Sequence, residues 1–160
     1  MKKIFTLLAL TISFIINAQM SDNSTGTSAN GSRSVAMGSY TTASGDYSTA
    51  MGQDSTASGI TSTAMGAGTN ATGQRSTSMG NYTTASGSRS VAMGYKALAA
   101  GDRSVAMGTD TRASDLNSLV IGQYNSSGYS VTSADSFSTS APAFVIGNGT
   151  TSNARSDAFK

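Results

Sequence analysis

The sequence predicts an all-β protein, a parallel β-solenoid with two short strands in each fourteen-residue coil. Six of the eight methionines recur every fourteen residues, and a glycine follows each of them. A second glycine column keeps the same period half a repeat away. A repeat this regular indicates one structural unit copied along an axis. The methionines are Met37, Met51, Met65, Met79, Met93 and Met107. The predicted turn glycines are Gly31, Gly38, Gly45, Gly52, Gly59, Gly66, Gly73, Gly80, Gly87, Gly94, Gly101 and Gly108.

Residues 1–18 are typical of a secretory signal peptide. Lys2 and Lys3 form a short basic start, an apolar stretch runs from Ile4 to Ile16, and cleavage is expected after Ala18. An uncleaved anchor is the alternative. We therefore expect the protein to be exported.

Composition excludes several classes of function. Without the leader, 8 basic residues remain (10 minus Lys2 and Lys3) against 8 acidic ones, which disfavours an electrostatic grip on nucleic acid or anionic lipid. Cysteine is absent, so disulfides cannot stabilise the fold. Histidine and glutamate are absent too, so a nucleophile–base pair or a metal site would have to use aspartates, lysines or hydroxyls. We expect no enzymatic activity, no cofactor and no metal.

Each repeat reads as two strands of about five residues and two turns. In the first strand, small and large side chains alternate, so that Val35 and Met37 point one way and Ser34 and Ala36 the other. The second half, Thr41–Ser44, is β-branched and small, which favours a strand. Glycines at both junctions permit positive φ angles. Seven such coils, stacked at the strand spacing, would make a rod about 30 Å long.

Side-chain size predicts what lies inside the rod. A two-stranded coil has room for little more than methyl groups, so the alanine columns are expected inside and the methionines outside. Six methionines in one outward stripe exceed what a soluble monomer exposes. We therefore expect an obligate, parallel homo-oligomer. The predicted interior is Ala36, Ala43, Ala50, Ala57, Ala64, Ala71, Ala85, Ala92, Ala99 and Ala106. The predicted interface is Val35, Met37, Met51, Met65, Met79, Val91, Met93, Val105, Met107 and Ile121.

The segments Ser34–Gly38, Ser90–Gly94 and Ser104–Gly108 read S-V-A-M-G. They resemble the S-V-A-I-G motif of YadA-like trimeric autotransporter adhesin heads, over residues 24–122. The resemblance implies a left-handed parallel β-roll, a homotrimer, a bacterial cell-surface or secreted location, and binding of host matrix protein or glycan on the roll's exterior. Methionine replaces the family's isoleucine. The family's stalk and membrane anchor are not found in the sequence, so any membrane attachment would need an anchor outside this chain.

Residues 123–160 are less regular. Ala143–Gly147 echoes Ser118–Gly122 after 25 residues instead of fourteen, so eleven extra residues are expected to loop out between Gln123 and Pro142. Arg155–Phe159 copies the pattern of Arg103–Met107. We interpret this region as irregular capping coils that continue into a stalk or anchor. A contact site on its loop is the alternative.

The sequence gives little support to carboxylate chemistry or to calcium or copper binding. Asp46 and Asp102 share one column, and Asp54 and Asp110 another; they read as solvated turn residues. Calcium-binding β-rolls need a nine-residue period with aspartate in each copy. A copper site on the methionine column is outweighed by packing. The candidate ligand surface near the corners is Arg33, Tyr40, Arg75, Tyr82, Arg89 and Arg103.

Three functions remain open. An adhesin head is favoured, and a purely structural segment of a secreted or phage-like trimeric fibre is its main rival. Thr41, Thr69, Thr83 and Thr111, with Ser55, form a column assigned to the face opposite the stripe. Such a ladder resembles ice-binding solenoids, although the neighbouring column carries bulky Leu98 and Arg112.

Overall fold

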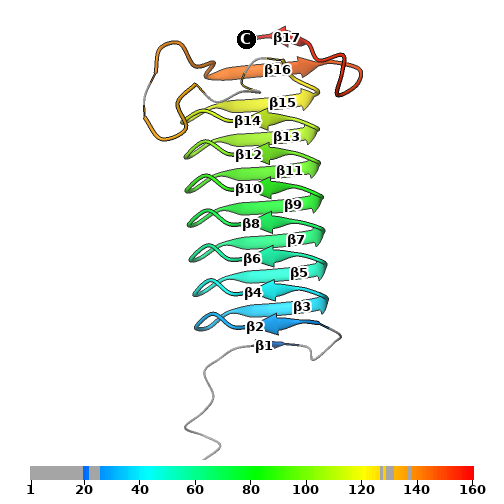
Figure 1. Cartoon of the computed structure of the whole chain (residues 1–160), viewed down its shortest axis with the longest axis vertical. Coiled ribbons are helices and arrows are strands. Elements are labelled where there is room, and N and C mark those ends of the chain that lie inside the picture. The colour runs from blue at the N-terminus through cyan, green and yellow to red at the C-terminus, as the bar shows by residue number, and fades with distance from the viewer. Residues whose placement is uncertain (1–19, 22–25, 127, 129–131, 137) are drawn as a thin grey trace, which may run out of the picture.

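The computed structural model describes residues 20–21, 26–126, 128, 132–136 and 138–160. The predicted signal peptide, 1–18, lies outside the described residues. Within them the protein is all-β, without a helix, and its strands stack into one long roll (Figure 1). Each full coil has one five-residue and one two-residue strand. The five-residue strands are β3 (Val35–Ser39), β5 (Thr49–Gln53), β7 (Thr63–Ala67), β9 (Thr77–Asn81), β11 (Val91–Tyr95), β13 (Val105–Thr109), β15 (Leu119–Gln123) and β16 (Phe144–Asn148). The two-residue strands are β1 (Met20–Ser21), β2 (Ser28–Ala29), β4 (Thr42–Ala43), β6 (Thr56–Ala57), β8 (Asn70–Ala71), β10 (Thr84–Ala85), β12 (Leu98–Ala99) and β14 (Arg112–Ala113).

Two sheets form the walls of the roll. The five-residue strands, with the short strands β1 and β17 (Asp157–Phe159) at the two edges, make a ten-stranded sheet in the order β1-β3-β5-β7-β9-β11-β13-β15-β16-β17. The other two-residue strands make a seven-stranded sheet from β14 back to β2. In the regular coils every pairing is parallel, with equivalent residues adjacent: Met37 pairs with Met51, and Met51 with Met65. The predicted fourteen-residue parallel solenoid is thus confirmed.

The second strand is shorter than predicted. A corner precedes this strand and another follows it. Residues that were expected to belong to a five-residue strand lie in these corners instead. We call residues 32–33 and their equivalents in later coils the first corner, and residues 39–40 and their equivalents the second corner. Each corner places one residue in the left-handed region, as at Arg33 (φ 54°) and Tyr40 (φ 55°), so that the two corners together put every seventh residue there. Tight corners therefore leave only two residues in regular ladder geometry.

One of the two glycine columns, that of Gly31, differs from the prediction in its role. Left-handed corner positions are filled by arginine, tyrosine, aspartate and other residues, with glycine only at Gly26 and Gly68. Gly38 has φ 117°, whereas Gly31 has no positive φ. A Cβ on Gly31 would overlap the carbonyl oxygen of Gly45 in the next coil. That column is therefore glycine because the backbones approach closely, not because a turn needs positive φ.

The interior is thin, and before the last two coils it contains no large side chains. Ala36, Ala43 and their equivalents are fully buried, and the buried alanines form two clusters along the axis. Val120 and Val145 are the largest fully buried side chains and lie in the last coils. Hydroxyls fill the remaining columns. Among them, Ser78 Oγ and Thr83 Oγ1 lie 2.8 Å apart across the interior.

The two sheets end differently at the C-terminal end. β16 adds to β15 in parallel, with Leu119 beside Phe144, an offset of 25 residues. β17 (Asp157–Phe159) then pairs antiparallel with β16 and adds no further coil. The sequence similarity of this segment to Arg103–Met107 is therefore misleading. A tight turn, in which Thr150 N donates to Ala154 O at 3.0 Å, sends the chain back too early for a parallel crossover.

Candidate interaction surfaces

The outer surface of the ten-stranded sheet carries the large apolar side chains. We call this surface, formed by Val35, Met37 and their equivalents in later coils, the methionine face. Met37 is 37% exposed and Met107 is 40% exposed, whereas Met51, Met65, Met79 and Met93 are half-buried. Parallel register places each methionine directly beside the next. The face continues as Leu119 and Ile121 on β15 and as Phe144 and Ile146 on β16.

The outer surface of the seven-stranded sheet is different in character. Its half-buried outward positions begin with Thr42, Thr56 and Asn70 and end with Leu98 and Arg112. Hydroxyl, amide and guanidinium groups dominate this column. Of the two broad walls of the roll, only the methionine face therefore carries a continuous apolar column, beside which Thr49, Thr63 and Thr77 replace valine in three coils.

The threonine column assigned to the exterior lies inside the roll. Thr41, Thr69, Thr83 and Thr111 have no exposed surface, and neither has Ser55. Most of their hydroxyls bond within the interior, as where Thr69 Oγ1 donates to Ser55 Oγ at 2.9 Å, whereas Thr111 Oγ1 has no hydrogen-bond partner among the described residues. Thr41 lies two residues before Ala43, so the two side chains face the same way, and an exterior Thr41 was inconsistent with the interior position predicted for Ala43. A buried column cannot contact ice, so this observation removes the argument for an ice-binding surface.

The first corner carries most of the exposed cationic side chains, of which Arg75 donates to Gln74 Oε1 at 3.2 Å. Arg75, Arg89 and Arg103 are exposed at successive coils, and all three have φ between 55° and 60°. Arg33 instead donates to the Tyr47 hydroxyl at 2.6 Å and lies over its ring. The aspartates of this corner bond to backbone. Asp46 Oδ1 accepts from Ser32 N at 2.9 Å, and Asp102 Oδ1 accepts from Ser88 N at 2.8 Å.

The second corner carries most of the exposed aromatic side chains. Tyr40 and Tyr82 are 56% and 63% exposed. Each ring covers a glycine of the preceding coil: a Cβ at Gly68 would lie 2.7 Å from the Tyr82 ring, and one at Gly26 would overlap Tyr40. Lys96 lies over the Tyr95 ring, 5.3 Å from its centroid.

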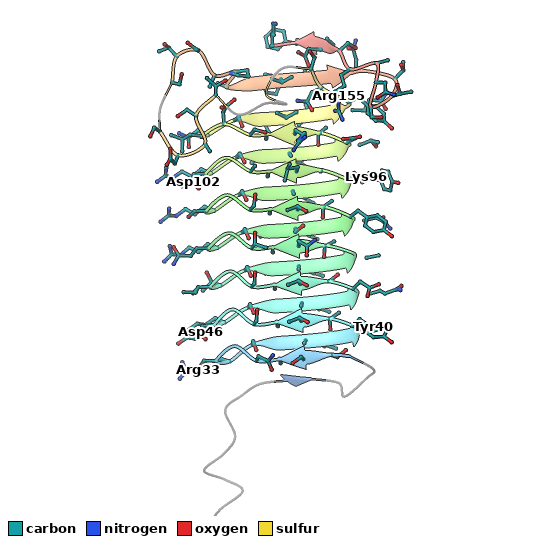
Figure 2. All side chains as sticks on the ribbon, in the orientation of Figure 1. Arg33, Tyr40, Asp46, Lys96, Asp102 and Arg155 are labelled. Atoms are coloured by element: carbon teal, nitrogen blue, oxygen red, sulfur yellow. The ribbon has the colours of Figure 1, made fainter. Side chains whose placement is uncertain are left out.

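The six residues of the candidate ligand surface fall on both corners. Arg33, Arg75, Arg89 and Arg103 lie on the first corner, whereas Tyr40 and Tyr82 lie on the second. Figure 2 places Arg33, Asp46 and Asp102 along one edge of the roll and Tyr40 and Lys96 along the other. The structure therefore divides them between two separate surfaces.

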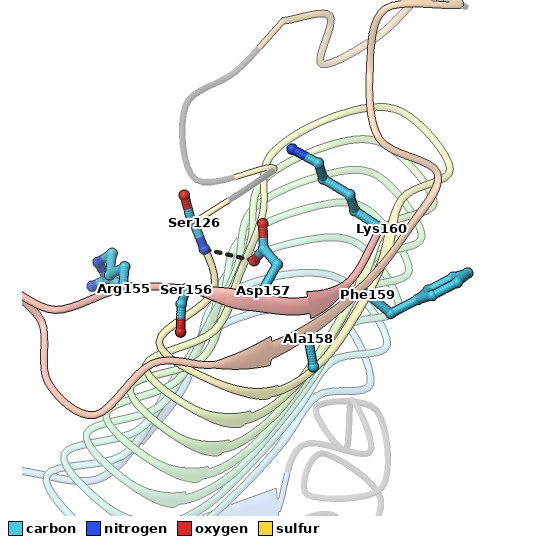
Figure 3. Close-up of a pocket in the computed structure, with 7 residues that line it drawn as sticks. All are labelled: Ser126, Arg155, Ser156, Asp157, Ala158, Phe159 and Lys160. Atoms are coloured by element: carbon cyan, nitrogen blue, oxygen red, sulfur yellow. Dashed lines mark hydrogen bonds between the residues drawn. The ribbon is translucent and has the colours of Figure 1, made fainter.

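A shallow hollow lies at the C-terminal end (Figure 3). Its volume is about 620 Å³, and Ser126, Arg155, Asp157, Phe159 and Lys160 contribute to its lining. The charged groups there are already engaged. Asp157 Oδ1 accepts from Ser126 N at 2.8 Å, and Arg155 forms an ion pair with Asp110 at 2.9 Å. These contacts hold β17 and its preceding turn against the last coils.

Two buried residues that sequence reasoning missed end the coil stack. Asn125 has no exposed surface; its Oδ1 accepts from Arg112 N at 2.8 Å and its Nδ2 donates to Arg112 O at 2.9 Å. This amide therefore completes the hydrogen bonds of the edge strand β14. Asp115 replaces glycine in its column, and its Oδ1 accepts from Thr132 N at 2.5 Å and Ser133 N at 2.6 Å. Both residues break their columns in the sequence, and that break is the signal that could have revealed them.

A search for catalytic or metal-binding arrangements was limited to the described residues. They contain no group of three or more histidine, cysteine, aspartate or glutamate side chains that could hold a metal ion. No helix there is long and apolar enough to cross a membrane. The candidate site is accordingly a surface, formed by the methionine face and the two corners.

Comparison with known proteins gives one assignment. The family model of the YadA head domain repeat matches overlapping segments that cover residues 25–97 and 99–125, more than half of the chain. The chain belongs to the YadA head domain repeat family. YadA heads are adhesin-type domains and are generally not enzymes. The matched region of this YadA head ends where Asn125 stops the seven-stranded sheet. Comparisons with curated proteins and with solved structures give no significant match.

Proposed function

We propose that this YadA head is a non-catalytic adhesin segment, exported to a bacterial surface or secreted, in which three chains join along their methionine faces. The observation that carries the proposal is the outward placement of one continuous apolar column on a roll whose other broad wall is polar. The same proposal includes a left-handed coil and a signal peptide at residues 1–18.

The thin interior supports assembly. A core of alanines and small hydroxyls buries little apolar surface per residue, so it offsets little of the entropy lost when the chain is ordered. Covering the methionine face in a neighbouring chain would add the missing burial, because each coil contributes one methionine and one valine or threonine. Monomeric soluble proteins rarely leave a contiguous apolar patch larger than a few hundred Å². We therefore infer that the interface residues are Val35, Met37, Met51, Met65, Met79, Val91, Met93, Val105, Met107 and Ile121.

The geometry of the methionine face favours a parallel, in-register arrangement. Its side chains repeat along the axis with the strand spacing of about 4.8 Å, so a shift by one coil preserves the packing but leaves one methionine uncovered at each end. Full overlap buries the most surface. Three copies around an axis is the arrangement that family membership supports.

Replacing one methionine with a charge tests the interface. We expect Met65→Asp to dissociate the assembly and to lower its melting temperature sharply, because the new carboxylate would be buried in an apolar seam. Asn70→Asp is the matched control, since it places the same side chain on the polar wall of the neighbouring sheet. Sedimentation and thermal unfolding monitored by circular dichroism report both effects. An unchanged assembly in Met65→Asp would mean that the methionine face is not the interface.

Adhesion is separable from assembly. We expect the assembled chain to bind at least one immobilised matrix protein or glycan, and the binding to depend on the corners and not on the methionine face. The rival, an inert segment of a trimeric fibre, assembles identically but binds none of them. A panel of matrix proteins and glycans, probed with the wild-type chain, therefore distinguishes the two.

A further inference from the structure

We propose that the first corner binds a carboxylated polysaccharide that runs along the roll axis. The inference rests on the proposed adhesive function and names the class of its partner. Its basis is a column of backbone N–H groups at the first residue of this corner: Ser32, Asp46, Ile60, Gln74, Ser88, Asp102 and Leu116.

The protein itself shows to which acceptors these N–H groups donate. In two coils the acceptor is an aspartate carboxylate from the next coil: Asp46 Oδ1 for Ser32 N, and Asp102 Oδ1 for Ser88 N. In the last two coils the acceptors are loop carbonyls, because Asp102 N and Leu116 N each donate at 2.8 Å to the C-terminal loop. Four of the seven positions are thus occupied by an oxygen from the chain, and two of those oxygens are carboxylate oxygens.

The three intervening coils leave the same position open. Among the described residues, the N–H groups of Asp46, Ile60 and Gln74 have no hydrogen-bond partner within the chain. The next coil supplies no carboxylate to any of them, because Ile60, Gln74 and Ser88 stand where an aspartate would be needed. Three adjacent donors are therefore free for acceptors from outside.

Guanidinium groups flank the open positions. Arg75 and Arg89 occupy the second residue of the same corner in the fourth and fifth coils, and Arg103 follows. All three are exposed, and none forms an ion pair with a carboxylate within the described part of the chain. Asp46 and Asp102 are the acidic groups of this corner, and each already bonds to backbone. Asp135, on the C-terminal loop, lies next to Ala134, whose carbonyl accepts from Asp102 N, beyond the open coils. A carboxylate at Ile60 N or Gln74 N would thus find a charged partner beside it.

The spacing of the coils selects a linear polymer. Successive donors are separated by about 4.8 Å, the distance between neighbouring strands. A linear polyuronate carries a carboxylate on every sugar, so one polymer lying along the axis can present carboxylates to more than one of these donors. Each contact is weak, but several on one polymer strengthen one another. A carboxylate is favoured over a sulfate because the chain's own carboxylates occupy the equivalent positions.

Polygalacturonate tests the proposal, with its fully methyl-esterified form as the uncharged control. We expect immobilised, unesterified polygalacturonate to retain the wild-type chain and the methyl ester not to retain it. Binding should weaken as the salt concentration is raised. Arg75→Asn with Arg89→Asn should reduce affinity about tenfold or more. Asparagine is chosen because Asn117 already occupies this left-handed position in the seventh coil. Lys96→Asn, on the opposite corner, should have no effect.

Gln74→Asp tests the open position itself. The introduced carboxylate should occupy Ile60 N as Asp46 occupies Ser32 N, and so reduce polygalacturonate binding about tenfold while leaving thermal stability unchanged or higher. Gln74→Asn is the neutral control. Absent binding to polygalacturonate, equal binding to the ester, binding to dextran sulfate alone, or unchanged affinity in both the arginine and the Gln74→Asp variants would overturn the proposal. Adhesion to other immobilised matrix would survive such a failure, which separates this inference from the proposed function.

Discussion

The regular coils and the C-terminal end satisfy the same backbone in different ways. Within the coils, backbone groups bond to the neighbouring coil at an offset that recurs in each repeat, as where Tyr47 N donates to Ser32 O and Thr61 N to Asp46 O. At the end, no equivalent follows, and side chains substitute: the Asn125 amide closes β14, and the Asp115 carboxylate holds the returning loop. The regular coils are thus stabilised by repeated backbone hydrogen bonds, whereas the C-terminal end depends on a few particular polar side chains.

This contrast also separates two kinds of glycine. In the coils, close backbone stacking leaves no room for a Cβ, and in the ten-stranded sheet the backbone is left-handed as well. At the end, Gly128 has φ 71° but no atom within 3.5 Å of a Cβ position. Glycine is therefore required for packing in the coils, whereas Gly128 is required only for its conformation. Gly147 and Gly149, also near the end, have no positive φ and resemble the closely packed coil glycines.

Adding one methyl group should expose this difference most strongly. Gly66→Ala combines φ 132° with an overlap against the Gly80 carbonyl, so we expect a loss of more than about 3 kcal/mol in the free energy of unfolding. Gly128→Ala meets only the conformational penalty and should cost about 1 kcal/mol. Chemical denaturation of both variants measures the two losses. Equal losses would mean that coil stacking is not as tight as described.

Removing the amide that ends the seven-stranded sheet should have the next largest effect. Asn125→Thr restores the residue type usual in its column but breaks both hydrogen bonds to Arg112. We expect a loss of about 2 kcal/mol and faster amide hydrogen exchange at Arg112 and neighbouring β14 residues. Asn81→Thr, at an exposed position whose column already carries Thr109, is the control. Unchanged exchange at Arg112 would show that the sheet end needs no such closure.

Releasing the loop should affect the end without affecting the coils. Asp115→Gly returns the position to the residue found in every preceding coil and removes the acceptor for Thr132 N and Ser133 N. We expect faster exchange at the Asp102 and Leu116 amides, which donate to that loop, and a change in global stability below about 1 kcal/mol. If exchange accelerates equally along the lower coils, the two regions do not behave independently.

Relieving backbone strain at a corner should give the smallest effect, in the stabilising direction. Thr61 is β-branched, yet it has φ 55°. Asparagine tolerates this conformation better, so Thr61→Asn should gain about 0.5–1 kcal/mol. Thr63→Asn, two residues along in β7, should not stabilise the protein because a strand favours threonine. A destabilised Thr61→Asn variant would indicate that the hydroxyl has a role that the corner geometry does not suggest.

The solenoid could be predicted from the sequence because the fourteen-residue period recurs in every coil. The register of Met37 with Met51 follows from that period alone. The corners could not be read the same way, since most of their left-handed positions are filled by arginine, tyrosine, lysine and threonine, which carry no turn signal. Thr41 was expected outside although Ala43, two residues later, was expected inside, and the structure buries both.

The ends were the least predictable region. Asn125 and Asp115 act through single contacts that depend on where the loop returns, and no period encodes that path. The open N–H groups at Ile60 and Gln74 were equally hidden, because backbone donors leave no trace in a sequence. By contrast, the exposed arginines were identifiable from their column, although not their separation from Tyr40 and Tyr82.

Sedimentation equilibrium of the dilute, folded chain tests the central claim most directly. If the methionine faces are covered by sister chains, the measured mass is three times that of one chain, and folded monomer is absent at every concentration at which circular dichroism still reports β-structure. A stable, fully folded monomer that leaves Met37 through Met107 in contact with water would contradict it.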